Sequence, residues 1–256
     1  MFMTDVITTD LLSASNQLNK IGDSFHHSHS DVSCFRLFQL ISPSLPIGGF
    51  TYSQGLEWAV EAGWVSNQAK LMDWLEMMIN NSLVTLELPI LAKFYQALEI
   101  DDDVSIEYWS QYLYSCRETS ELRAEELQRG KALFTLLKQL DLPIKGEWQP
   151  EDDPKAAMQN QLLGFCVAAK AWGISLHSLQ QGYLWSWAEN IVMAGVKLVP
   201  LGQTAGQKSL IALSEWLPQA IKKANQIQDD DIGSFTPAVA IASSRHEIQY
   251  TRLFRS

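Results

Sequence analysis

The sequence has few cysteines and contains no Cys-x-x-Cys pair. Its three cysteines, Cys34, Cys116 and Cys166, are odd in number and far apart along the chain. This pattern suits neither a disulfide framework nor a thiolate metal site. We therefore expect reduced thiols and the cytosol as the compartment.

Basic residues are also scarce, since 19 Lys and Arg stand against 29 Asp and Glu, for a net charge of −10. A general nucleic-acid or anionic-membrane surface needs basic patches, so we expect protein partners, no nucleic acid and no membrane. The most membrane-like window, residues 183–201, contains Glu189, Asn190 and Lys197, which are costly in lipid. The first residues lack the apolar segment of a signal peptide. We expect a cytoplasmic protein.

Alternation with a period of two is missing as well, so no segment predicts a strand. Apolar residues instead recur at spacings of three and four, as in Leu71, Trp74, Leu75 and Met78. The segment 176–199 is apolar on all sides, which is typical of a helix in the middle of a bundle. The prediction is an all-α fold. Its parts are a mobile, His-containing tail (1–30) and a single-domain bundle of about ten helices (31–256) that ends in a docking segment (237–256).

The segment 42–64 starts with a loop that cannot be helical. Pro43 and Pro46 fix their own φ angles and push the residues before them toward extended backbone. Thr51 followed three places later by Gln54 is typical of a capping box. We predict that a helix begins directly after Thr51.

A later segment is rich in charge. Arg117 with Glu121 and Glu125 with Arg129 stand four residues apart, which predicts a helix face with salt bridges. Glu118, Glu121 and Glu125 also fall on one side of such a helix. An alternative is therefore an all-α hydrolase or lyase with these three carboxylates around a pocket.

Three histidines lie close together in the tail: His26, His27 and His29. Imidazoles at this spacing can capture nickel, copper or zinc, but a mobile segment has no preformed geometry. A solvated tail is the simpler interpretation. We expect no cofactor and place no metal site beyond this speculative one.

The carboxyl-terminal residues are basic and aromatic although the protein is acidic. Arginines and apolar anchors together are the composition of an interface hot spot, and we expect this segment to fold only when its partner binds. The simpler alternative is a terminal helix that packs on the body of the protein. The candidate partner-binding residues are Arg245, His246, Tyr250, Arg252, Leu253, Phe254 and Arg255.

A longer motif lies around the proline-rich loop. It consists of Ser42, Pro43, Leu45, Pro46, Gly48, Phe50, Tyr52, Ser53, Gly55, Leu56 and Glu57. This motif closely resembles the signature of the UreF-type urease accessory proteins. The segments 117–123, 171–173, 197–207 and 245–254 also match the pattern of that family. The resemblance covers the chain from about residue 35 onward.

The resemblance implies an all-α, dimeric, non-catalytic factor for maturation of the nickel enzyme urease. Similar proteins join an accessory protein of the UreD (UreH) type, recruit the UreG-type GTPase and help deliver nickel to apo-urease. We expect Tyr52, together with the turn that carries Lys197, Gln203 and Gln207, to frame the GTPase-facing surface or an internal passage. Lys197 is a candidate gate for GTP hydrolysis or ion passage, although it could equally cap helix carbonyls.

A further alternative makes the protein a regulator of the partner GTPase. An exposed arginine can supply charge to a GTPase in trans, and Arg117, Arg245 and Arg252 are the candidates.

Overall fold

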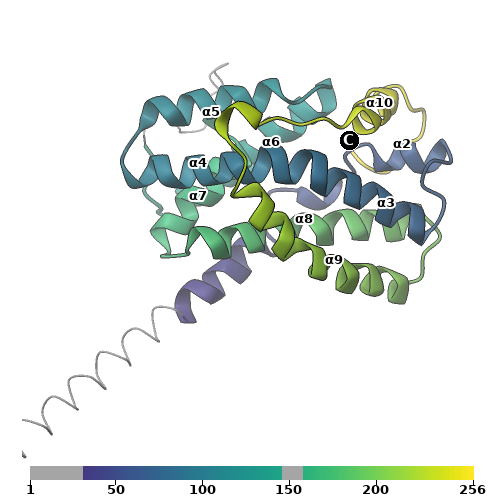
Figure 1. Cartoon of the computed structure of the whole chain (residues 1–256), viewed down its shortest axis with the longest axis horizontal. Helices are drawn as coiled ribbons and strands as arrows, with labels where there is room; N and C mark the ends of the chain where they lie inside the picture. Colours follow the sequence, from purple (N-terminus) through teal and green to yellow (C-terminus); the bar gives the residue numbers. More distant parts are fainter. Residues whose placement is uncertain (1–30, 146–157) are drawn as a thin grey trace, which may run out of the picture.

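Every regular element in residues 31–145 and 158–256, the part of the chain that the computed structural model describes, is helical (Figure 1). This confirms the predicted all-α class. The predicted mobile tail, with His26, His27 and His29, lies outside the described residues. The first helix covers residues 31–41. The elements that follow are η1 (Gly49–Thr51), α2 (Leu56–Glu61), α3 (Gln68–Met78), η2 (Ile79–Glu87), α4 (Leu88–Glu99), α5 (Asp103–Ser115), α6 (Ser120–Gln139), α7 (Gln161–Ala171), α8 (Leu176–Leu198), α9 (Gln203–Ala224), η5 (Asp229–Asp231) and α10 (Pro237–His246).

α8 is the central helix. It packs against α2, α3, α4, α7 and α9, as its apolar surface predicts. Small residues permit the closest contacts: a Cβ atom on Gly195 would lie 2.6 Å from a methyl group of Leu71 in α3, and one on Gly182 would lie 2.7 Å from Leu37. The helix of residues 31–41 therefore rests on α8, although it extends away from the bundle (Figure 1).

α3, η2 and α4 form one unbroken rod in which η2 is a π-helix (Figure 1). Pro89 lies in this rod and has no N–H group. The carbonyl of Thr85, which would accept the N–H of residue 89 in an α-helix, is therefore available to another donor. That carbonyl accepts the Gly233 N–H at 2.9 Å, and the Asn81 carbonyl accepts the Phe235 N–H at 2.9 Å. The rod thereby fixes the chain that leads into α10.

The predicted capping box is wrong. The Thr51 hydroxyl donates to the Gly48 carbonyl, and α2 begins only at Leu56, after Gly55. Gln54 adopts a left-handed conformation with φ 52°. Its amide is bonded to Glu125 and Trp187 instead, so these long-range partners outcompete a local cap.

Gly130 is a point of close contact between α6 and the turn before α7. A Cβ atom at this position would lie 1.6 Å from the backbone oxygen of Gln159, in the turn before α7. Rotation of a side chain cannot relieve a clash with backbone.

We predict that Gly130→Ala lowers the free energy of unfolding by about 3 kcal/mol, because α6 and α7 must move apart. Urea denaturation followed by circular dichroism measures the change. Gly202→Ala is the matched control, since no atom lies within 4 Å of its Cβ position. Equal stability of the two variants would contradict the packing described here.

Candidate functional site

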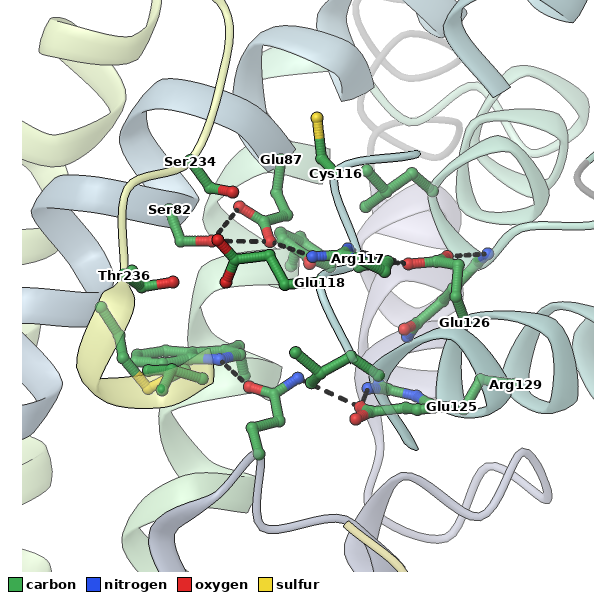
Figure 2. Close-up of a pocket in the computed structure, with 18 residues that line it drawn as sticks. Ser82, Glu87, Cys116, Arg117, Glu118, Glu125, Glu126, Arg129, Ser234 and Thr236 are labelled. Atoms are coloured by element: carbon green, nitrogen blue, oxygen red, sulfur yellow. Dashed lines mark hydrogen bonds and ion pairs between the residues drawn. The ribbon is translucent and has the colours of Figure 1, made fainter. Parts of the chain in front are cut away.

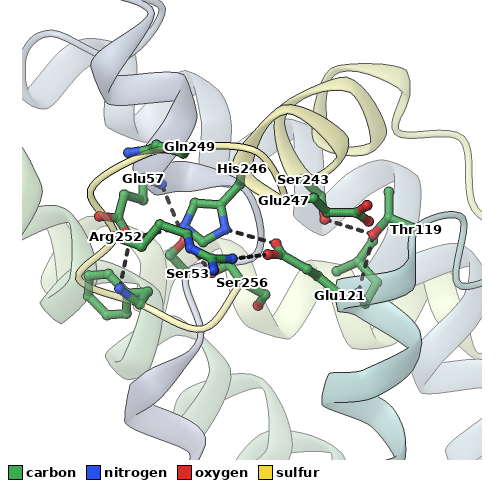
Figure 3. A network of polar contacts seen from close by, with 12 residues as sticks. Ser53, Glu57, Thr119, Glu121, Ser243, His246, Glu247, Gln249, Arg252 and Ser256 are labelled. Atoms are coloured by element: carbon green, nitrogen blue, oxygen red, sulfur yellow. Dashed lines mark hydrogen bonds and ion pairs between the residues drawn. The ribbon is translucent and has the colours of Figure 1, made fainter.

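Glu57, on α2, binds the end of the chain. Its carboxylate accepts the backbone N–H groups of Leu253 at 2.6 Å and Phe254 at 2.8 Å (Figure 3). It also lies 3.1 Å from Nε2 of His246, the last residue of α10. Glu57 is only 6% exposed, so these donors replace the water that an ionised carboxylate otherwise needs. We call residues 247–256 the C-terminal segment.

His246 joins three helices. Its ring is fully buried, with Nε2 toward Glu57 of α2 and Nδ1 2.8 Å from Glu121 of α6 (Figure 3). Both ring nitrogens lie within hydrogen-bond distance of carboxylate oxygens. Arg252 forms an ion pair with the same Glu121 at 3.1 Å. α2, α6, α10 and the C-terminal segment are therefore held by one polar network.

The C-terminal segment also bonds to the signature loop. The backbone N–H and the hydroxyl of Ser53 donate to the Ser256 carbonyl at 2.6 and 2.5 Å, and the Arg255 N–H donates to Thr51 at 2.8 Å. Phe254 is buried, and its ring centroid lies 5.7 Å from the Lys197 ammonium nitrogen. The expectation that this segment folds only on a partner therefore differs from the structure, in which it is packed on the body.

The candidate residues of α10 and the C-terminal segment divide into two groups. His246 and Phe254 are buried, so in this conformation they hold the segment in place and do not face a partner. Tyr250 is fully exposed and Leu253 is 66% exposed. The remaining candidates on the surface are Arg245, Arg252 and Arg255.

Of the other candidate residues, Tyr52 and Lys197 lie next to the C-terminal segment, whereas Gln203 and Gln207 lie on α9. Tyr52 is buried and donates its hydroxyl to Gln128, and burial raises the pKa of its phenol although Arg255 opposes the shift. Lys197, in the last turn of α8, is exposed above Phe254. Gln203 and Gln207 are exposed at the start of α9.

A second cluster of charges lies inside the bundle (Figure 2). Arg117 forms ion pairs with Glu87 and Glu126, both at 2.8 Å, and Arg129 pairs with Glu125 at 2.7 Å. Burial alone would lower the pKa of Arg117, but Glu126 and Glu87 outweigh burial and raise it. These side chains surround a cavity of about 50 Å³, which we call the ion-pair cavity.

The predicted pairing is half right. Glu125 and Arg129 pair as expected, but Arg117 does not pair with Glu121. α6 begins at Ser120 with Thr119 as its cap, so Arg117 precedes the helix and the four-residue spacing does not apply to it. Sequence periodicity gave no signal for the partner Glu87, which lies 30 residues away on another element.

The structure also separates the three carboxylates of the proposed enzyme. Glu118 and Glu125 line the ion-pair cavity, whereas Glu121 contacts His246 and Arg252. Glu125 accepts hydrogen bonds from Arg129, Gln54 and Ser256. The three groups therefore do not share one pocket.

Residues 31–145 and 158–256 contain no cluster of three His, Cys, Asp or Glu side chains that could hold a metal ion. No helix in this part of the chain is both long and apolar enough to cross a membrane.

Comparison with known proteins gives one family. The family model described as UreF matches residues 65–214. A protein of Alcanivorax borkumensis named urease accessory protein UreF is 52% identical, over 87% of this chain and 97% of its own length. Proteins of the same name from Alkalilimnicola ehrlichii and a strain of Pseudomonas putida are 47% and 49% identical, over 86% and 89% of this chain and 95% and 100% of their own lengths.

We predict that Arg117→Met lowers the free energy of unfolding by about 3–5 kcal/mol, because it leaves two buried carboxylates without their cation. Urea denaturation measures this loss. Lys70→Met is the control: the Lys70–Asp73 pair is exposed, so its removal changes stability by less than about 1 kcal/mol. A similar small change in Arg117→Met would contradict the role given to the ion pairs.

Proposed function

Because this chain belongs to the UreF family of urease accessory proteins, we propose that it is a non-catalytic scaffold in urease maturation. In this proposal it assembles with a UreD (UreH)-type accessory protein and a UreG-type GTPase and helps deliver nickel to apo-urease. It acts in the cytoplasm. The observation that carries the proposal is that the C-terminal segment presents exposed apolar side chains and is held on the protein by buried ion pairs.

The C-terminal segment has the properties of a binding surface for the UreD-type partner. Tyr250 and Leu253 are exposed, Ile248 is 76% exposed, and Arg245 stands beside them at the end of α10. Aromatic and arginine side chains of this kind dominate binding energy at protein interfaces. Glu57 already holds the backbone of this segment, so a partner does not bear the entropy of ordering it.

The GTPase-facing surface is proposed to lie next to it, around Lys197, Gln203 and Gln207. Lys197 rests on the ring of Phe254, and Phe254 is fixed through its backbone N–H by Glu57. Phe254 therefore connects the two proposed surfaces. A partner that binds the C-terminal segment can for this reason alter the position of Lys197. We therefore keep Lys197 as the candidate gate, although its place in the last turn of α8 also suits a helix cap.

The chain is also proposed to form a homodimer. Val32, Phe35 and Phe38 recur at every third position of the helix 31–41 and are 56%, 71% and 57% exposed. An apolar stripe of this kind on a projecting helix is typical of a subunit interface.

The alternative function is activation of the GTPase by an arginine supplied in trans. Arg117 is committed to two buried carboxylates, and Arg252 is paired with Glu121. The favoured candidate for this alternative is therefore Arg245, which is exposed at the end of α10.

We predict that Tyr250→Glu and Leu253→Glu each weaken binding of the UreD-type partner at least about 30-fold, because a charge replaces an apolar contact at the interface centre. Co-purification and calorimetry of the full chain measure this. Ile211→Glu, at a 65% exposed position on α9, is the matched control and keeps the affinity. If both variants kept the full affinity for the partner, the C-terminal segment would not be part of the interface.

We predict that Lys197→Ala raises the single-turnover rate of GTP hydrolysis by the UreG-type partner in the complex several-fold, because the gating charge is lost. Lys208→Ala, at another exposed lysine of α9, leaves the rate unchanged. An unchanged rate in Lys197→Ala would reject the gate. A slower rate that Arg245→Ala reproduces would favour the activating alternative.

A further inference from the structure

α5 is a helix at the edge of the bundle and packs chiefly against α4 (Figure 1). Its inner side is the expected one for such a helix, since Ile106, Trp109 and Leu113 are buried. The outer side of an edge helix faces water and is ordinarily polar. On α5 part of this outer side is apolar, so the helix carries apolar surface that the fold itself does not bury.

Three large apolar side chains follow the outer side of α5 at every fourth position. Ile100 is 75% exposed, Val104 81% and Tyr108 56%. Val104 and Tyr108 lie one turn apart on one helix face, and Ile100 lies in the turn that leads into α5. Single exposed apolar residues are common on protein surfaces, whereas a contiguous group of them marks a contact surface. We call these three residues the α5 row.

The ring of Tyr108 is held in position by its neighbours. It stands edge-on to the ring of Trp109, with ring centroids 4.9 Å apart, and stacks on Tyr112 at 6.2 Å. Trp109 is buried, and the hydroxyl of Tyr112 donates to the Ile232 carbonyl. An aromatic side chain that is already fixed loses little conformational entropy when a partner covers it. Tyr108 therefore has the properties of an interface anchor.

The α5 row lies in strongly acidic surroundings. The carboxylates on or beside α5 and on the neighbouring η5 are those of Asp101, Asp102, Asp103, Glu107, Asp229, Asp230 and Asp231. Lys93 connects η5 with α5, since its ammonium nitrogen lies 2.6 Å from Asp229 and 5.9 Å from the ring centroid of Trp109. Lys145 pairs with Asp101 and Asp103. Seven carboxylates and two lysines give these surroundings a formal charge of −5.

This charge decides what the α5 row can bind. A second copy paired symmetrically through the row would bring two acidic surfaces together, and like charges oppose such contact. Nucleic acid and anionic lipid are repelled for the same reason. The segments of this chain outside the described residues are acidic as well: residues 1–30 contain three aspartates and one lysine, and residues 146–157 contain four carboxylates and one lysine. The complementary occupant is a basic segment of another protein.

We propose that the outer side of α5 is a docking surface for a basic amphipathic helix of a partner protein. Such a helix lays apolar side chains, spaced by three and four residues, on the α5 row. Its flanking Lys and Arg side chains meet the carboxylates around the row, which steers the encounter and sets the orientation. The inference does not depend on the partners proposed above, because no residue of the α5 row belongs to the surfaces assigned to them.

The experiment uses the full chain and a fluorescent synthetic peptide as the probe. The peptide is a helix of about 18 residues with Leu along one face and Lys or Arg on both flanks. A peptide of identical composition in scrambled order is its control. Fluorescence anisotropy at low ionic strength measures both affinities. We expect the amphipathic peptide to bind at least about tenfold more tightly, because only its apolar face matches the α5 row.

Variants of the full chain locate the binding site. Val104→Ser and Tyr108→Ala each weaken binding of the amphipathic peptide about tenfold, because they remove apolar contact without changing the charge. Ile211→Ser, at an exposed position on α9, is the matched control and keeps the affinity. Glu107→Gln weakens binding about threefold at low salt and has no effect at high salt, where the charge is screened. Glu61→Gln, at an exposed position on α2, is the control for this charge change and has no effect at either salt concentration.

Three results would overturn the proposal. Equal affinity for the two peptides would mean that net charge alone attracts them. Unchanged affinity in both Val104→Ser and Tyr108→Ala would place the peptide elsewhere on the protein. A change in the oligomeric state of the isolated chain in Val104→Ser, measured by sedimentation velocity, would mean that a second copy covers the α5 row. Both side chains are exposed, so the variants keep the fold, which circular dichroism checks.

Discussion

The buried carboxylate of Glu57 is the constraint on which the rest of the site depends. A carboxylate that is only 6% exposed must find donors, and here the chain itself supplies them through Leu253, Phe254 and His246. The bonds to Leu253 and Phe254 run to the backbone. They fix the path of the C-terminal segment and leave the side chain of Leu253 outside. The hydrogen bonds that satisfy the buried Glu57 carboxylate thus also hold the side chain of Leu253 at the surface.

This arrangement gives the signature motif a physical meaning. Ser53 and Leu56 are fully buried, Gly55 permits close approach of α10, and Glu57 binds the C-terminal segment. These residues therefore face the interior, and Ser53, Gly55 and Glu57 contact α10 or the C-terminal segment. The motif shapes a surface far away in sequence, since Glu57 and Leu253 are 196 positions apart.

Much of the fold could be predicted from the sequence, because helical periodicity is a local signal. The central helix α8 and the Glu125–Arg129 pair followed from spacing alone. The partners of Arg117, the conformation of Gln54 and the burial of His246 did not, since each depends on residues from distant elements. Composition identified the C-terminal segment as unusual, but it could not tell that His246 and Phe254 would lie inside the protein and Tyr250 outside.

The central claim is that Glu57 holds the C-terminal segment on the body of the isolated protein. Amide hydrogen exchange of Leu253 and Phe254, resolved by NMR in the free chain, tests it most directly, because their N–H groups are the ones that Glu57 binds. The account predicts that both amides exchange far more slowly than the amide of Tyr250, which is an exposed residue of the same segment. Exchange of both amides at the rate of an unstructured peptide would contradict the account.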